Sequence, residues 1–231
     1  MHELSEKLVS LNKEFEDISW THPKNIVILP IISEKMNYKH MLEIGTYMGA
    51  VPIMIKHLEK YLGIDCIKQF TLIENFDDHL MWKTEVADPL ALKEVMIRKI
   101  SSPVDIIIKN SLVQISENSL PCFDVIHFDS VKWQYLLIKQ FNAIQKYCHK
   151  NTLFIFDDYI AEWPDVIYCV NEIVKQNNLY VIATFGPKIY VGSNESKNRI
   201  LEIVSNVEFF NIRETILYGN VISSGSGLIT S

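Results

Sequence analysis

Several protein classes are excluded by what this sequence has little of. Its 231 residues contain four cysteines without a C-x-x-C pair, and no Cys/His cluster of the kind that binds zinc. No apolar run approaches the roughly 20 residues that a membrane-spanning helix needs. The 22 basic residues are outnumbered by 28 acidic ones, for a net charge of −6, and they form no stripe with interleaved aromatic residues. The sequence therefore predicts neither a membrane protein nor a nucleic-acid-binding protein.

The remaining composition is typical of a globular protein. Hydrophobic residues make up 48% of the chain and charged residues 22%, and the length suits one α/β domain with a sizeable core. Residues 1–7 lack the basic and apolar regions of a secretory signal, so we expect a cytoplasmic protein. The cysteines, which we expect to be reduced thiols, are Cys66, Cys122, Cys148 and Cys169.

A glycine turn is the feature around which the sequence is organised. The short apolar run Met41–Ile44 includes Glu43 and leads into Gly45 and Gly49, after which a helical pattern begins. This order predicts a strand, a tight turn and a helix, the opening unit of a nucleotide-binding type of sheet. The spacing E-x-G-x-x-x-G differs from a dinucleotide motif, and Glu43 would repel a phosphate. We interpret the turn as a site for a cationic or hydroxyl-bearing ligand, with a purely structural turn as the alternative.

Strand and helix patterns alternate through the middle of the chain, which predicts the α/β class. The last two strands are joined only by Gly186-Pro187, too short for a crossover helix, so we expect them to be antiparallel. The predicted strands are 40–44, 70–74, 104–108, 123–128, 152–156, 180–185 and 188–192, and the predicted helices are 51–61, 89–100, 131–148 and 164–176.

Three segments are predicted along the chain. Residues 1–39 form a helical cap segment, with an amphipathic helix near the start and a connector that contains a short helix. Residues 40–192 form the core. Residues 193–231 contain a helix near 198–205 and then a tail that we interpret as flexible from its Ser/Gly content.

Acidic or amide residues follow most of the predicted strands. Carboxyl ends of parallel strands meet at the edge of the sheet where ligands bind, so these side chains would crowd together there. Crowded carboxylates repel one another unless a cationic ligand or a hard metal ion compensates them. The strand-end residues are Glu43, Glu74, Asn110, Asp129, Asp157 and Asp158, of which the last three offer the oxygen ligands that Mg²⁺ prefers. We interpret His127 as a hydrogen-bonded core residue rather than a metal ligand.

Asp129, Lys132 and Tyr135 recur at a spacing of three residues where a helix is predicted to begin. This spacing brings Asp129 and Lys132 close together. A lysine beside acids is ordinarily a solvated ion pair, but next to a metal-bound hydroxyl it can accept a proton.

Together these motifs resemble the class I S-adenosylmethionine-dependent methyltransferases, and more narrowly the metal-dependent O-methyltransferases of the catechol and caffeoyl-CoA type. The loop Leu42–Gly49 is similar to the cofactor loop of that group, and Asp129–Tyr135 is similar to its D-x-x-K-x-x-Y segment. Asp157 and Asp158 resemble its Asp-Asn pair, with Asp in place of Asn, and also resemble sugar and antibiotic O-methyltransferases.

The resemblance covers about residues 40–192. It implies a single Rossmann-like domain with a seven-stranded, mostly parallel sheet, an antiparallel C-terminal hairpin and helices on both faces.

The resemblance also implies S-adenosylmethionine as the cofactor, Mg²⁺ as an assisting metal ion and a small-molecule hydroxyl as the substrate, and it leaves a homodimer open. Asp129, Asp157 and Asp158 would hold the metal ion, and Lys132 would accept the hydroxyl proton, with Asp129 as the second catalytic residue. The implied cofactor-binding residues are Glu43, Gly45, Thr46, Tyr47, Gly49, Glu74, Asn110, Ser111 and Asp129.

Two other interpretations are kept. One is a methyltransferase for a sugar or another natural product that uses the three acids differently, which metal dependence and a substrate screen would distinguish. The other is a protein of this fold that binds the cofactor or a partner without catalysis, which tight cofactor binding without turnover would favour.

Overall fold

The computed structural model describes residues 2–15, 21–75, 88–100, 102–109, 120–130, 134–207, 210–217 and 220–228. Within those ranges, no helix is long and apolar enough to cross a membrane.

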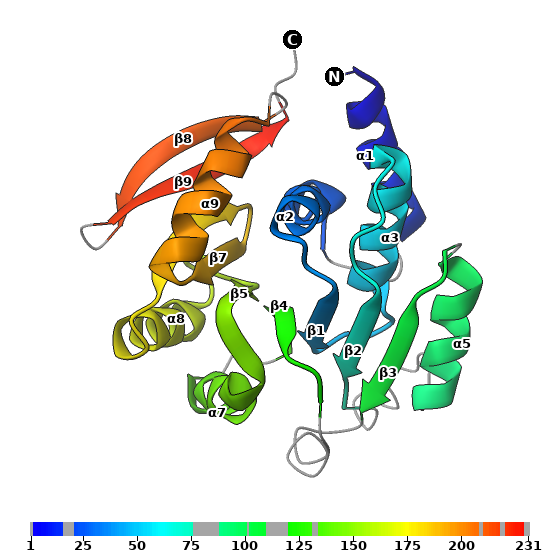
Figure 1. The fold of residues 1–231 in the computed structure, drawn as a ribbon, viewed down its shortest axis with the longest axis horizontal. Helices are drawn as coiled ribbons and strands as arrows, with labels where there is room; N and C mark the ends of the chain where they lie inside the picture. The colour runs from blue at the N-terminus through cyan, green and yellow to red at the C-terminus, as the bar shows by residue number, and fades with distance from the viewer. Residues whose placement is uncertain are drawn as a thin grey trace.

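The described chain alternates helices and strands, as Figure 1 shows. The helices are α1 (His2–Phe15), η1 (Pro23–Asn25), α2 (Ile28–Met36), α3 (Ala50–Leu62), α5 (Pro89–Lys99), α7 (Gln134–Ile144), η2 (Gln145–Tyr147), α8 (Pro164–Gln176) and α9 (Asn194–Ser205). The strands are β1 (His40–Ile44), β2 (Gln69–Ile73), β3 (Asp105–Lys109), β4 (Phe123–Phe128), β5 (Cys148–Phe156), β6 (Tyr180–Phe185), β7 (Lys188–Gly192), β8 (Phe210–Leu217) and β9 (Asn220–Leu228).

All the described strands join one sheet in the order β3-β2-β1-β4-β5-β7-β6-β9-β8. The first five are parallel, and β7 is antiparallel to both β5 and β6. The seven-stranded, mostly parallel arrangement closed by an antiparallel hairpin is therefore confirmed. The chain reverses direction along the sheet between β1 and β4, which is where ligands bind in open α/β sheets.

The sheet extends beyond the predicted seven strands. Strand β9 pairs in parallel with β6, and β8 pairs with β9, so the described sheet has nine strands. These two strands appear in orange and red beyond α9 in Figure 1. The segment 223–227, which the sequence suggested as part of a flexible tail, therefore lies in a strand, and Ser223–Gly225 pair with the edge of β6. Small residues indicated a flexible tail locally, but the open edge of β6 provides a partner that local composition does not reveal.

The helices divide between the two faces of the sheet, as predicted. Helices α1, α2, α3, α5 and α9 contribute to one core, and α7 and α8 contribute to the other. The division of the chain at residues 39 and 192 stays a prediction, although α1, α2 and α9 share their core with the central strands.

One helix boundary differs from the prediction. Helix α7 ends at Ile144, and β5 begins at Cys148, four residues earlier than the predicted strand. The early start is stabilised by His149, whose Nε2 lies 2.9 Å from Asp124 Oδ1, while Asp124 Oδ2 accepts the backbone N–H of His40 at 2.9 Å. These contacts connect distant segments, so the helical pattern alone placed the boundary too late.

The register of the sheet determines which strand-end side chains share a face. Glu43 on β1 is paired with His127 on β4, which is paired with Ile155 on β5, which is paired with Tyr190 on β7. Cross-strand partners lie on the same face, and so do residues two positions further along a strand. Lys188, two residues before Tyr190, is thus directed to the same face as His127.

Candidate functional site at the carboxyl edge of the sheet

The glycine turn after β1 packs directly against the end of β4. Gly45 has a φ of 84°, and a Cβ added there would lie 2.4 Å from the Cα of Ser130 and 2.6 Å from the carbonyl oxygen of Asp129. Its N–H donates to the carbonyl oxygen of Ile73 at 2.8 Å. Glycine is required here by both the backbone conformation and the close contact with Asp129-Ser130, so the tight turn predicted at Gly45 is present.

Gly49 has a structural role at the start of α3. It caps α3 with a φ of 71°, and a Cβ there would lie 2.9 Å from the Sδ of Met96 on α5. The missing side chain therefore makes room for a contact between α3 and α5, and the role of Gly49 in cofactor binding stays a prediction. Tyr47, between the two glycines, also has a positive φ of 50°. Such strain in a residue other than glycine persists only where the surrounding structure over-determines it.

Glu74, which follows β2, helps to hold Tyr47 in this conformation. Its Oε2 accepts a short hydrogen bond from the N–H of Tyr47, and its Oε1 accepts the N–H of Asn75 at 2.8 Å. The side chain is half-buried and lies over the glycine turn. Its carboxylate thus stands at the edge of the sheet where an acid of this type can accept the hydroxyl groups of a ribose.

Glu43 is placed beneath the turn and not at its surface. Its side chain is buried, with Oε2 accepting the Oγ1 hydroxyl of Thr46 at 2.7 Å and Oε1 lying 2.8 Å from Nδ1 of His127. A direct contact between Glu43 and a bound ligand stays a prediction. Both carboxylate oxygens are already hydrogen-bonded inside the protein, so Glu43 supports the ligand loop through Thr46.

The hydrogen bonds continue from Glu43 across the sheet. Nε2 of His127 lies 3.0 Å from Nζ of Lys188, and the same ammonium makes a short ion pair with Oδ2 of Asp157. We use the name buried relay for the five residues that these hydrogen bonds connect: Thr46, Glu43, His127, Lys188 and Asp157. It connects the glycine turn to the acids after β5, and the interpretation of His127 as a hydrogen-bonded core residue agrees with its place in it.

The partners of His127 indicate its charge. Burial, and then the charge of Lys188, lower the pKa of His127 below its ordinary value. Since the Glu43 carboxylate can only accept a hydrogen bond, the ring proton belongs on Nδ1, and Nε2 is left to accept a hydrogen bond from the ammonium of Lys188. His127 is therefore a neutral bridge between a buried carboxylate and a buried ammonium.

The strand-end acids meet as predicted, although the group they form is different. Ligand atoms of His127, Asp129 and Asp157 all lie within 4.8 Å of one another, and Asp158 does not belong to this group. Burial raises the pKa of Asp157, but the charge of Lys188 and hydrogen bonds with Lys188 and Asp129 outweigh it, so the pKa lies below the ordinary value. Asp158 has a left-handed φ of 58°, and its N–H donates to Oδ1 of Asp157 at 2.9 Å.

These residues, as arranged, do not fit a bound Mg²⁺. An octahedral site needs free oxygen ligands around the ion, but Oδ2 of Asp157 is paired with Lys188 and its Oδ1 accepts the N–H of Asp158. Both ring nitrogens of His127 face protein partners as well. A metal ion would therefore have to displace Lys188 from Asp157.

Three predicted site residues cannot be placed. Asn110, Ser111 and Lys132 lie outside the described residues, so their roles stay predictions.

Lys188 was not among the predicted site residues. Its one local signal is a lysine at the start of the otherwise apolar strand Lys188–Gly192, which the structure buries completely. A buried lysine is rare unless it is paired.

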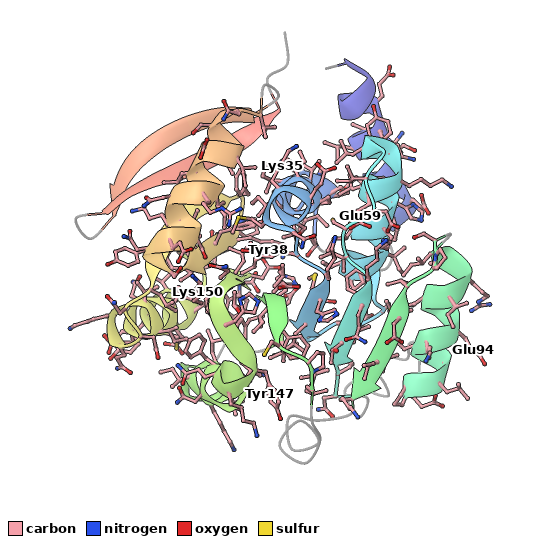
Figure 2. All side chains as sticks on the ribbon, in the orientation of Figure 1. Lys35, Tyr38, Glu59, Glu94, Tyr147 and Lys150 are labelled. Atoms are coloured by element: carbon pink, nitrogen blue, oxygen red, sulfur yellow. The ribbon has the colours of Figure 1, made fainter. Side chains whose placement is uncertain are left out.

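A separate pocket of about 590 Å³ opens between α2 and α9. It is lined by Lys35 (labelled in Figure 2), Arg199 and Ile203, among others, and by none of the predicted site residues. It therefore does not enlarge the candidate site at the strand ends.

Comparison with known proteins identifies solved structures that have a similar fold. No family model matches the sequence, and no curated protein matches it. Among solved structures, the chain is similar to CalS11, a TDP-rhamnose 3′-O-methyltransferase in calicheamicin biosynthesis, with a TM-score of 0.56 and 14% identity over 82% of this chain and 87% of that one.

Two further solved structures agree with that likeness. For the O-methyltransferase NovP the TM-score is 0.54 at 12% identity, over 74% of this chain and 78% of that one. For the O-methyltransferase from Bacillus cereus in complex with SAH, the TM-score is 0.50 at 17% identity, over 80% and 87%. At such identities the likeness concerns the backbone, and the chain has the Rossmann-like fold of these O-methyltransferases.

Proposed function

We propose that this protein is an S-adenosylmethionine-dependent O-methyltransferase that acts on a hydroxyl group of a small molecule. The observation that carries the proposal is the meeting of three features at one sheet edge: the glycine turn packed on Asp129-Ser130, the Glu74 carboxylate over that turn, and Asp157 beside Asp129. The fold is one in which solved neighbours are O-methyltransferases, including one in complex with SAH.

In this proposal Glu74 accepts hydrogen bonds from the ribose hydroxyl groups of the cofactor. Its carboxylate is half-buried, so it is accessible but less hydrated than a surface acid. Thr46 and Glu43 hold the turn from below, and Tyr47 is held by its N–H on Glu74. The net result is a preorganised loop, which lowers the conformational cost of binding.

The cofactor supplies a methyl group on a positively charged sulfonium. The acidic edge formed by Asp129 and Asp157 favours a cation there. From the D-x-x-K-x-x-Y resemblance, Lys132 takes the proton that the acceptor hydroxyl releases, and Asp129 holds Lys132 or the hydroxyl in place. The hydroxyl oxygen would bond to the methyl carbon as the bond from that carbon to sulfur breaks, so that neutral S-adenosylhomocysteine would leave and Lys132 would hold the proton.

Magnesium assistance through Asp129, Asp157 and Asp158 is the finer form of this proposal that the sequence suggests. The group formed by His127, Asp129 and Asp157 is the only support for it among the described residues, and Lys188 already pairs with two of its members. We therefore route no step of the reaction through a metal ion.

The first test is calorimetric titration with S-adenosylmethionine and S-adenosylhomocysteine. We expect saturable binding, and we expect Glu74→Gln to weaken it by about tenfold or more because a charged hydrogen-bond acceptor is lost. The matched control is Glu195→Gln. It makes the same chemical change at an exposed residue, which forms a surface ion pair with Lys150. No binding of either ligand by the wild-type protein would overturn the proposal.

The second test separates catalysis from binding. Lys132→Ala should lose about 100-fold or more of the turnover found in a screen of catechols, phenols and sugar nucleotides, while cofactor affinity is retained. An unchanged rate would remove Lys132 from the mechanism. Tight cofactor binding without turnover of any acceptor would favour a non-catalytic binding protein instead.

A further inference from the structure

Lys188 is a buried cation at the place where the acids of the site meet. Its side chain has no exposed surface, and its ammonium contacts Nε2 of His127 and Oδ2 of Asp157. An ammonium is removed from water only when close partners compensate the loss of hydration. The position of Lys188 is therefore specified by Asp157 and His127.

The strands that carry these residues explain how the contact arises. Strand β7 runs antiparallel to β5, with Ile189 opposite Phe156, so Lys188 lies opposite the residue that follows, Asp157. His127 lies on β4, the other neighbour of β5. The hairpin that closes the sheet thus delivers a positive charge to the carboxyl ends of two parallel strands.

The same atoms form the metal-type group of the structure. His127, Asp129 and Asp157 bring one ligand atom each to within 4.8 Å of one another, and Lys188 contacts two of the three. A divalent ion at that group and the ammonium would repel each other strongly in a buried environment of low dielectric constant. Only one of the two cations can be held there.

We propose that Lys188 is the built-in cation of this site: it takes the place of a divalent metal ion at Asp157, so that methyl transfer by this protein requires no divalent metal. Lys188 is a positioning residue, because it touches Asp157 and His127 and not the reacting atoms. Through His127 and Glu43 it also supports Thr46 in the glycine turn. The exclusion of a divalent metal ion from Asp157 does not depend on the proposed function, whereas metal-independent methyl transfer rests on it.

Titration with Mn²⁺, followed by the electron paramagnetic resonance of the free ion, tests the metal statement without any need for turnover. We expect wild-type protein to show no saturable site in the micromolar range. Lys188→Gln should bind Mn²⁺ at least about tenfold more tightly, because it frees Asp157 and His127 while keeping a polar side chain. The added Asp157→Asn change should abolish that gain.

The matched control is Lys56→Gln, which removes the other buried lysine of the described chain that is paired with acids. Lys56 contacts Glu59, on the same helix α3, and Asp65, which follows that helix. We expect Lys56→Gln to leave Mn²⁺ affinity as it is in the wild type. An equal gain in both variants would mean that loosening of the protein exposes carboxylates in general, and would overturn the proposal.

Two other results would also overturn it. One is micromolar binding of Mn²⁺ or Mg²⁺ to the wild-type protein that is lost in Asp157→Asn. The other is a Lys188→Gln protein that is folded by circular dichroism and gains no affinity. If Lys188→Gln does not fold, the wild type decides the question: cofactor binding and turnover unchanged by a chelator support the proposal, and loss of turnover restored by Mg²⁺ overturns it. Failure to bind cofactor at all would refute the proposed function while leaving the metal titration valid.

Discussion

Two buried lysines of the described chain, Lys56 and Lys188, are both paired with acids, and their partners come from different distances along the chain. Lys56, on α3, donates to Glu59, to Asp65 at 2.9 Å and to the carbonyl oxygen of Ile67 at 3.0 Å, all within 11 positions of itself. Glu59 is labelled on α3 in Figure 2. Lys188 instead pairs with residues 31 and 61 positions away.

This difference separates a structural lysine from one that shapes the site. The acceptors around Lys56 tie α3 to the chain that enters β2, and Glu59 Oε1 also accepts the N–H of Ile67 at 2.9 Å. Lys188 connects three strands at the edge of the sheet where a ligand would bind. Similar burial and similar pairing therefore serve local folding in one case and the organisation of the site in the other.

The largest expected effect is on stability, and it should be shared by both lysines. Lys56→Met and Lys188→Met each leave a carboxylate without its counterion, so we expect each to lower the free energy of unfolding by about 3–5 kcal/mol. Urea denaturation followed by circular dichroism measures this. A loss below about 1 kcal/mol for Lys188→Met would mean that its buried ion pair is not formed in solution.

A double-mutant cycle should then distinguish the two lysines. Adding Asp157→Asn to Lys188→Met neutralises the carboxylate left behind, and we expect a coupling energy of about 2 kcal/mol. Adding Asp65→Asn to Lys56→Met should recover much less, because Asp65 is 54% exposed and the buried Glu59 remains charged. Equal recovery in the two cycles would contradict the view that Asp157 is the principal counterion of Lys188.

The smallest effect concerns pH and the neutral bridge at His127. Its pKa is lowered in the folded protein, so below its ordinary value of 6.5 the unfolded chain takes up a proton that the folded protein does not. The neutral His127 therefore contributes fully to the free energy of unfolding above pH 6.5. As the pH falls below 6.5, the free energy of unfolding decreases by up to about 1.4 kcal/mol per pH unit.

His127→Gln should remove that slope. A glutamine amide can donate to Glu43 and accept from Lys188 without titrating. We therefore expect the difference in free energy of unfolding between wild type and His127→Gln to narrow as the pH falls from about 7.5 to about 5. Parallel curves over this range would show that His127 is not held neutral.

Part of the site could be predicted from local pattern. The strand–turn–helix around Gly45 follows from an apolar run and two glycines, and the position of Glu74 follows from the end of the next strand. The closeness of Asp129 and Asp157 follows from neighbouring parallel strands. In each case the residues are adjacent to an element whose direction the hydrophobic pattern already indicates.

The relay could not be predicted in the same way. Glu43 was expected to precede the turn, but its contact with His127 arises only because β1 and β4 pair in one register. Gly49 accommodates Met96, a contact between two helices that no local pattern specifies. Register and helix packing depend on the whole core, and a shift of one residue would direct every side chain to the other face.

The linear order of residues was sufficient for the α/β class, the glycine turn and the acidic strand ends, because each depends on periodicity or on residue types within a few positions. It was not sufficient for the edge strands β8 and β9, nor for the charge that faces Asp157. Those depend on contacts between segments far apart in the chain. In the linear sequence, Lys188 does not differ from the other lysines. The β6–β7 hairpin brings its ammonium against the ends of β4 and β5. Within the described part of the chain, the buried ammonium is there bonded to His127 and Asp157.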